Sequence, residues 1–153
     1  MSEGSPKNIR KEGVSSKTDE LATTLLGDAF DVVASGCELG VLLAVQDIKD
    51  TVISFEFSGD GEEVLIAEAH SRVRTLMHAK GDSETNFSTP VRYALTYLGA
   101  VASDDESGYK DALFLEFGEM GYKSYSAYSY VKGRNGDFKW SEPAPAGEVE
   151  PLL

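Results

Sequence analysis

Cysteine is nearly absent from this chain, which has a single one, Cys37, among its 153 residues. A disulfide within the chain is therefore excluded, and a reducing compartment is favoured. No run approaches the roughly 18 consecutive apolar residues that a membrane-spanning helix needs. Residues 1–16 contain no apolar segment of the kind that a secretory signal carries. Together these absences predict a cytoplasmic protein.

Positive charge is also scarce. The chain has 14 lysine and arginine residues against 26 aspartate and glutamate residues, which gives a net charge of −12. The basic residues do not gather into one strong cluster along the sequence. Nucleic acids require a basic surface that neutralises phosphates, and anionic membranes attract the same residues. We therefore expect neither a nucleic acid nor a membrane as a partner.

The common motifs of phosphate and metal sites are incomplete. Residues 58–63 lie where a phosphate-binding loop occurs, but the lysine of a P-loop is missing. Glu62 and Glu63 would also repel a phosphate from the start of the helix that follows. His70 and His78 begin roughly 12 Å apart on a helix, which is too far for both to bind one metal ion. No cofactor and no metal site are predicted.

Two groups of carboxylates remain as candidates for chemistry. An acidic loop lacks the spacing of glycine and glutamate that a calcium-binding EF-hand requires, and it comprises Asp104, Asp105, Glu106 and Asp111. Glu56 and Glu116 lie in similar strand-like settings, and on neighbouring strands they would share a face as an acid–base pair. Cys37 is expected to be a small buried thiol, because the preceding helix end disfavours a thiolate. No catalytic residues are predicted, and an enzyme is the less favoured class.

The composition otherwise fits one globular domain, because 41% of the residues are hydrophobic and 10% are aromatic. Residues 1–16 are polar and lack periodicity, so we expect a flexible N-terminal arm. Residues 17–140 form a single α+β domain. Residues 141–153 contain three prolines and three glutamates, which predicts an extended acidic tail. This tail either folds back on the basic face of the second helix, binds another subunit or stays free.

Hydrophobic periodicity predicts two helices and about five strands. A helix is expected over about 18–35, with an apolar stripe of Leu21, Leu25, Leu26, Ala29, Val32 and Val33. Residues 62–80 alternate in part like a strand, but the helix signals, such as Asp60 as N-cap with Glu63 three residues later, are stronger. Residues 90–102 fit either a helix or a strand, and their alternating aromatic content favours a strand. The other expected strands are 40–47, 51–57, the two arms of 111–131 and a short one near 138–140.

The order α-β-β-α-β-β-β, with short connections between successive strands, predicts an α+β domain with an antiparallel sheet of about five strands. The two helices are expected to cover one or both faces of this sheet. The order is similar to that of roadblock/longin-type and profilin-like small domains. The likeness concerns element order alone and carries no functional residue to this chain.

Tyrosine is concentrated in the second half of the chain, above all in the predicted hairpin 111–131. Alternation along its second strand places Tyr122, Tyr128 and Tyr130 on one face and Tyr125 on the other. One of these faces is expected to be core, because both together would expose a sizeable apolar patch. Tyrosine and tryptophan are suited to interfaces. The candidate interface residues are Tyr122, Tyr125, Tyr128, Tyr130 and Trp140.

These observations favour a non-enzymatic protein–protein interaction or adaptor domain that uses a tyrosine-rich sheet surface. The partner is either a second copy, in a homodimer, or another protein. A small-molecule binding domain, with a pocket between the sheet and a helix, is the alternative. A hydrolase or isomerase built on Glu56, Glu116 or a histidine is a more remote alternative.

Overall fold

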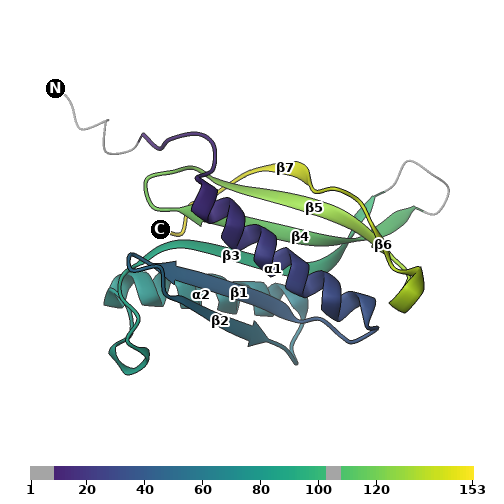
Figure 1. Ribbon diagram of the computed structural model, residues 1–153, viewed down its shortest axis with the longest axis horizontal. Coiled ribbons are helices and arrows are strands. Elements are labelled where there is room, and N and C mark those ends of the chain that lie inside the picture. Colours follow the sequence, from purple (N-terminus) through teal and green to yellow (C-terminus); the bar gives the residue numbers. More distant parts are fainter. Residues whose placement is uncertain (1–8, 103–107) are drawn as a thin grey trace.

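The computed structural model describes residues 9–102 and 108–153. Two long helices lie on opposite faces of one antiparallel sheet (Figure 1), as expected for the α+β class. The helices are α1 (Ser16–Ala34) and α2 (Glu62–Ala79). The strands are β1 (Val41–Asp47), β2 (Val52–Phe57), β3 (Pro90–Ala102), β4 (Tyr109–Glu119), β5 (Ser124–Lys132), β6 (Lys139–Trp140) and β7 (Ala144–Val149).

Within the described residues the sheet has seven strands, in the order β2-β1-β3-β4-β5-β6, and β7 also pairs with β5. This is more than the five or so strands that the sequence predicts. The difference lies mainly in β7, because Pro145 within it and Pro143 just before it hide its strand character at the sequence level. Pro145 is tolerated because β7 is an outer strand, where a missing N–H need not break a ladder on both sides. The order of the remaining elements and the strand assignment of residues 90–102 are confirmed.

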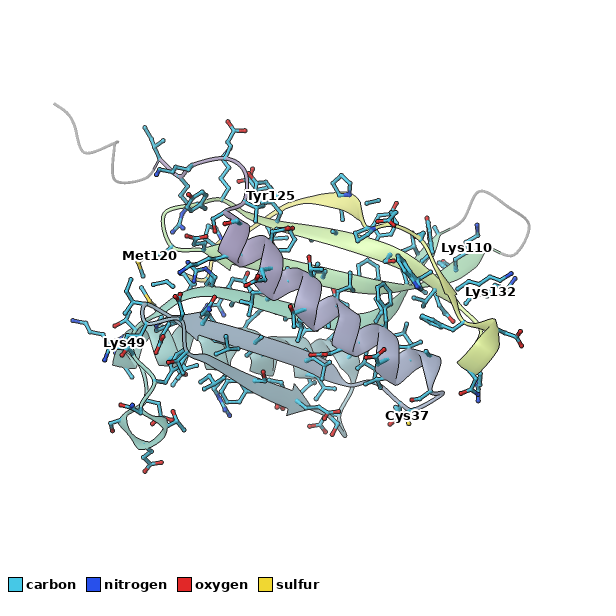
Figure 2. All side chains as sticks on the ribbon, in the orientation of Figure 1. Cys37, Lys49, Lys110, Met120, Tyr125 and Lys132 are labelled. Atoms are coloured by element: carbon cyan, nitrogen blue, oxygen red, sulfur yellow. The ribbon has the colours of Figure 1, made fainter. Side chains whose placement is uncertain are left out.

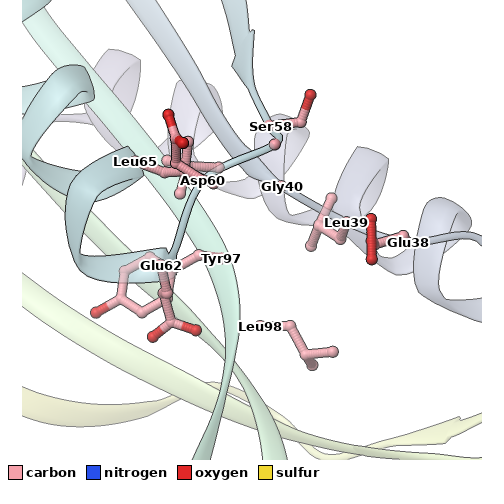
Figure 3. Close-up of a pocket in the computed structure, with 11 residues that line it drawn as sticks. Glu38, Leu39, Gly40, Ser58, Asp60, Glu62, Leu65, Tyr97 and Leu98 are labelled. Carbon is pink, nitrogen blue, oxygen red and sulfur yellow. The ribbon is translucent and has the colours of Figure 1, made fainter.

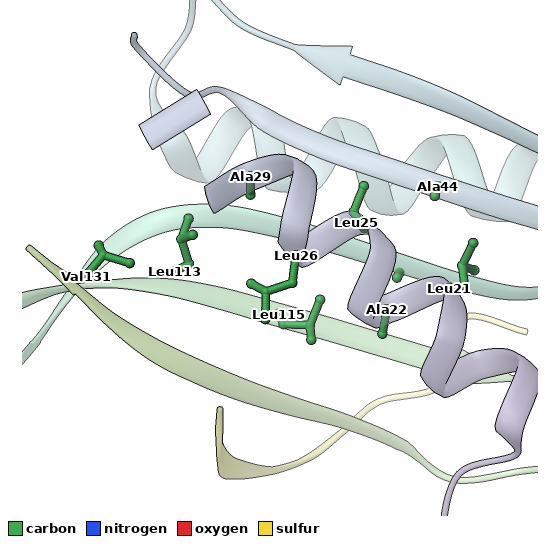
Figure 4. Close-up of a cluster of buried hydrophobic side chains, with 10 residues drawn as sticks. Leu21, Ala22, Leu25, Leu26, Ala29, Ala44, Leu113, Leu115 and Val131 are labelled. Atoms are coloured by element: carbon green, nitrogen blue, oxygen red, sulfur yellow. The ribbon is translucent and has the colours of Figure 1, made fainter. Parts of the chain in front are cut away.

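Helix α1 begins at Ser16 because Ser15 acts as its N-cap and accepts a hydrogen bond from the Thr18 backbone N–H at 3.3 Å. Its buried stripe packs on β1, β3 and β4. The cluster of side chains beneath it (Figure 4) contains Leu21, Ala22, Leu25, Leu26, Ala29, Ala44, Ala94, Leu113, Leu115 and Val131. The predicted helix is therefore confirmed, and its apolar stripe is buried from Leu21 to Ala29, whereas Val32 and Val33 near the end of the helix are only partly buried.

Helix α2 packs mainly on β1, β2 and β3. Its N-cap is Gly61, which has no side chain to cap the helix, and not Asp60 as the sequence pattern suggests. The helix ends at Ala79, and the next residue, the C-cap Lys80, adopts a left-handed conformation with φ of 59°. The cluster beneath α2 contains Val41, Leu43, Val45, Leu65, Ala69, Val73, Leu76, Phe87, Tyr93 and Leu95. Alternate residues of β1 and β3 thus supply the two cores.

Segments at both ends of the described chain contact the domain. Lys11 forms a parallel bridge with Tyr122, and Arg10 donates hydrogen bonds to the carbonyl oxygens of Tyr122 at 3.1 Å and Leu153 at 2.7 Å. Leu152 and Leu153 pack against the cluster beneath α2. Residues 1–8 of the predicted arm lie outside the described residues. In the described part of the chain, no helix combines the length and apolar character needed to cross a membrane.

Candidate binding surface

The two faces of the sheet are covered to different extents. Helix α1 lies over the middle of one face, where it contacts β4 as well as β1 and β3. On the other face α2 lies over β1, β2 and β3, so β4 and β5 extend beyond it. Glu116 of β4 still lies beneath α2, where it contacts His70, but Phe114 of β4 and Tyr128 and Tyr130 of β5 point to the same side beyond the edge of that helix.

Four aromatic side chains on this surface contact one another in a row across the strands. Tyr97 of β3 stacks on Phe114 of β4, with ring centroids 5.4 Å apart. Phe114 contacts Tyr128 of β5 at 6.3 Å, and Tyr128 contacts Tyr130 at 5.3 Å. The register explains the row, because Tyr97 pairs with Phe114 and Phe114 pairs with Tyr128. We call these four residues the aromatic row, and each of them is half-buried.

Gly99 is required for the position of the second ring. A Cβ atom at Gly99 would lie 2.7 Å from Cε2 of Phe114, so any larger residue would displace this ring. The glycine lies two residues after Tyr97 and is paired with Ala112. Its missing side chain lets the Phe114 ring lie over β3 and stack on Tyr97. In the sequence, a glycine inside a strand with alternating aromatic residues is the pattern that indicates such a close approach.

The structure divides the five predicted interface residues among several places. Tyr128 and Tyr130 lie together in the aromatic row. Tyr125 points to the opposite face, where it contacts Phe117 and its hydroxyl accepts a hydrogen bond from the Gly13 N–H at 3.0 Å. Tyr122 lies at the β4–β5 turn beneath the Lys11 ammonium group. Trp140 stacks on Phe30 of α1 at 5.1 Å while its side chain stays 52% exposed.

A hollow of about 680 Å³ adjoins the aromatic row where β4 begins and β5 ends, next to β6. Its volume is within the usual range of ligand pockets, roughly 300–1,000 Å³. Lys110, Lys132 and Lys139 line it together with Tyr109, Tyr130 and Trp140. The Lys110 ammonium group lies over the Tyr130 ring, 5.4 Å from its centroid. We call this site the lysine hollow, and sequence reasoning missed it because the lysines are far apart in the chain.

A buried polar network beneath α2 contains the groups best suited to acid–base chemistry. Glu116 hydrogen-bonds His70 of α2 at 3.0 Å and accepts a hydrogen bond from the Tyr93 hydroxyl at 2.6 Å. Burial, and then the charge of Glu116, raises the pKa of Tyr93 far above its ordinary value, so the phenol stays a neutral donor. These groups bond to one another and thereby join α2 to β3 and β4.

The predicted pair of Glu56 and Glu116 is not formed. Glu56 is paired with Leu42 and points to the α1 side, whereas Glu116 is paired with Leu95 and points to the α2 side. Strands β1 and β3 also separate the two carboxylates. The likeness of their local sequences reflects strand alternation only, and the two glutamates face opposite sides of the sheet.

A second hollow lies between the sheet and the start of α2 (Figure 3). The alternative function, a small-molecule binding domain, predicts a pocket between the sheet and a helix. The volume of this hollow, about 240 Å³, is below the usual range of ligand pockets. Glu38, Asp60 and Glu62 line it together with Tyr97. Burial and the neighbouring Glu63 raise the pKa of Glu62. Burial and the carboxylates of Glu62 and Glu116 raise the pKa of Tyr97, so the hydroxyl at this end of the aromatic row stays neutral.

The remaining candidates from the sequence are the acidic loop, a metal site and Cys37, and the described residues form no functional site at any of them. The acidic residues 104–106 lie outside the described residues, and Asp111 lines the lysine hollow. Within 9–102 and 108–153, no three His, Cys, Asp or Glu side chains are grouped so that they would hold a metal ion. Cys37 is exposed and not buried as expected, because it lies in the segment between α1 and β1 and outside both cores.

Comparison with known proteins returns no match to this chain among protein-family models, curated proteins or solved structures.

Proposed function

We propose that this chain is a non-enzymatic protein–protein interaction domain that binds a partner protein with the aromatic row. The observation that carries the proposal is a row of contacting rings: Phe114, Tyr128 and Tyr130 lie on sheet surface beyond α2, and Tyr97 joins them from the edge of the cluster beneath α2. Rings held in contact lose little further side-chain freedom when a partner covers them, and they bring both apolar area and hydroxyl groups.

The chemistry of the polar side chains supports a binding role over a catalytic one. Glu116 and Tyr93 lie beneath α2, and Glu116 hydrogen-bonds both Tyr93 and His70 of that helix. Tyr93 is fully buried, and Glu116 is only 14% exposed at its side chain. A substrate at this place would have to displace the contacts that hold α2 on the sheet.

The proposal takes a different protein as the partner. Each copy of this chain carries a net charge of −12, and such a charge opposes the approach of a second copy. A cytoplasmic, reducing location is part of the proposal. It is supported by the exposed thiol of Cys37, which an oxidising compartment would leave open to intermolecular pairing.

Site-specific photo-crosslinking in cells tests the proposal. Tyr128 is replaced by p-benzoylphenylalanine, and the matched control carries the same residue in place of Thr24, which is exposed on α1. We expect a discrete adduct with a different protein from position 128 and none from position 24. A second substitution in the row, Phe114→Ala, should weaken this adduct at least about tenfold, since a hot-spot ring contributes about 1.4 kcal/mol or more.

Three results would contradict the proposal. No adduct from position 128 would leave the aromatic row without a partner. The same adducts from both positions would show unspecific contact. An adduct with a second copy would replace the heterologous partner with a homodimer, and the concentration dependence of sedimentation would then confirm the change.

A further inference from the structure

We infer that the edge of the sheet at β2 binds an extended segment of a partner protein, which adds a strand to the sheet and places a carboxylate at Arg72 and a basic side chain at Glu56. Strand β2 is the last one on its side of the sheet (Figure 1). Strand β1 separates it from β3, the nearest strand of the aromatic row. The inference therefore goes beyond the proposed function and concerns a different surface.

The backbone of β2 has alternate groups that point out of the sheet. The Asp47 N–H donates a hydrogen bond to the Thr51 carbonyl at 2.9 Å, and the antiparallel register of β1 with β2 continues from this pair without a shift. Bonded and non-bonded pairs alternate along such a ladder, so the N–H and C=O groups of Val52, Ser54 and Glu56 point away from β1. In the described part of the chain, no other segment bonds these groups. The ligand that matches such a row of donors and acceptors is an extended chain.

The two outer sides of the sheet differ in their protection against such pairing. On the far side, beyond β5, Pro145 lies within β7 and Pro143 just before it, and proline on an outer strand hinders the addition of another. Strand β2 contains neither proline nor lysine, and the nearest lysine along the chain, Lys49, lies in the preceding turn (Figure 2). Its residues are mostly β-branched or aromatic, as is typical of strands. The edge at β2 is thus open to a further strand.

On the α2 side of this edge, a guanidinium group is held over two rings. Arg72 of α2 lies 4.7 Å from the ring centroid of Phe55 and 5.7 Å from that of Phe57. Its side chain is exposed. Among residues 9–102 and 108–153 it forms no ion pair, not even with Glu68, which lies one turn earlier on α2. A carboxylate on an added strand would therefore meet a cation that is already positioned, and arginine–carboxylate contacts are among the stronger hydrogen bonds.

On the α1 side of the same edge, the charge has the opposite sign. Glu56 points to this side, whereas its neighbours Phe55 and Phe57 point to α2. Helix α1 packs mainly on β3, β4 and β1, so Glu56 stays exposed. Successive residues of an added strand would likewise point to the two sides in turn. The segment that fits therefore carries an acidic residue next to a basic one, and a segment with these charges exchanged is repelled on both sides.

A different protein fits this edge better than a second copy of the chain does. The strand that a second copy would add, Val52–Phe57, contains no basic side chain to meet Glu56. The net charge of −12 on each copy also opposes their approach. The occupant is therefore an extended segment of another protein.

Amide hydrogen exchange, followed by NMR, tests this inference with a defined probe. The probe is the synthetic peptide Thr-Val-Thr-Glu-Lys-Val-Thr, whose valines and glutamate share one face of a strand and whose lysine lies on the other. In the free protein, the amides of Val52, Ser54 and Glu56 should exchange at least about tenfold faster than those of Ile53 and Phe55, which bond β1. A peptide concentration about ten times its Kd should slow the three outward amides about tenfold.

Substitutions at Ser54 separate backbone pairing from side-chain contact. Ser54→Pro removes an outward N–H and should weaken peptide binding at least about tenfold. Ser54→Ala is the matched control, since it keeps the N–H and should leave binding unchanged. Should Ser54→Pro impair folding, Val52→Pro gives the same test, because proline is tolerated at the first residue of a strand.

A charge exchange tests the two flanking residues. Arg72→Glu and Glu56→Lys should each weaken binding of the probe about threefold or more, because each reverses one exposed charge at the edge. The double variant should instead prefer the peptide Thr-Val-Thr-Lys-Glu-Val-Thr. Arg74→Glu is the control, since Arg74 is exposed on the same helix and contacts neither Phe55 nor Phe57; it should leave the preference of the wild type unchanged.

Several results would overturn the inference. The outward amides could exchange slowly in the free protein at every concentration, or stay unprotected at millimolar peptide. Ser54→Ala could weaken binding as much as Ser54→Pro, or the wild type could bind both peptides equally. Protection that grows with protein concentration in the absence of peptide would assign the edge to a second copy. None of these results bears on the crosslink from position 128, which tests the aromatic row by itself.

Discussion

At the scale of single residues, buried carboxylates hold the loops and the start of α1 in place. Asp47 is fully buried at the end of β1. Its carboxylate accepts backbone N–H groups from Lys49 at 2.9 Å, Thr51 at 2.8 Å and Ser88 at 2.8 Å. Burial by itself would raise the pKa of Asp47, but these three hydrogen bonds and the Lys49 charge outweigh it and lower the pKa. The residue thus ties the β1–β2 turn to the segment before β3.

Asp47→Asn should destabilise the protein by roughly 1–3 kcal/mol, because an amide cannot accept all three N–H groups and leaves a buried donor unsatisfied. The pKa of Asp47 is lower in the folded than in the unfolded state. Its contribution is therefore complete above the unfolded pKa of about 3.9 and is lost as the pH falls through the folded value. The difference in the free energy of unfolding between wild type and variant, measured by urea denaturation, should be largest at neutral pH and should narrow in acid.

Asp28→Asn, at an exposed position of α1, is the control and should leave the free energy of unfolding unchanged. A difference for Asp47→Asn that stays constant below pH 4 would contradict the role of Asp47.

Glu119 connects α1 to the sheet in a similar way. It accepts hydrogen bonds from the hydroxyls of Ser15 and Thr18, and its other oxygen lies 3.6 Å from Arg92. Burial by itself would raise the pKa of Glu119, but the two hydroxyls and the guanidinium group lower it. The N-cap residue of α1 is thus bonded to the end of β4.

At the scale of elements, the last segment of the chain contributes to two parts of the fold. Strand β7 pairs with β5 and covers an edge that would otherwise have free backbone groups. Beyond it, Leu152 and Leu153 cover part of the cluster beneath α2, and Arg10 bonds the Leu153 carbonyl. Residues 9–15 and the tail therefore meet near the β4–β5 turn.

Removal of Leu152 and Leu153 should lower the free energy of unfolding by about 1–2 kcal/mol, since both side chains are partly buried. Amide hydrogen exchange should increase most in α2, whose core loses these contacts, and little in α1. Glu150→Gln is the control for a change in the exposed part of the tail. Unchanged exchange in α2 would show that the two leucines do not pack there in solution.

At the scale of the whole molecule, the two faces of the sheet have different roles. Helix α1 lies over β3 and β4 and buries Leu113 completely. Helix α2 leaves part of β4 and β5 beyond its edge, and there the aromatic row stays half-buried. One face is thus core along most of its length, whereas the other is divided into a core and a surface.

This asymmetry predicts unequal effects of truncation on neighbouring strands. Leu113→Ala should cost about 3 kcal/mol, because it leaves a cavity beneath α1. Tyr128→Ala should cost about 1 kcal/mol or less, since its ring lies at a surface. Urea unfolding of both variants at several protein concentrations measures the difference. If Tyr128→Ala were as costly as Leu113→Ala, the row would be covered in the free protein.

The sequence by itself determined most of the local structure: two amphipathic helices, the strands other than β7 and the opposite faces of Tyr128 and Tyr125. These follow from periods of 3.6 and 2 residues, which are properties of the backbone. Only the tertiary structure decided that α2 leaves part of β4 and β5 uncovered, that Tyr97 and Phe114 join Tyr128 and Tyr130, and that Glu56 and Glu116 are separated. It also brought Lys110, Lys132 and Lys139 to one hollow. Such juxtapositions depend on strand order and helix placement, which long-range packing selects and no local period encodes.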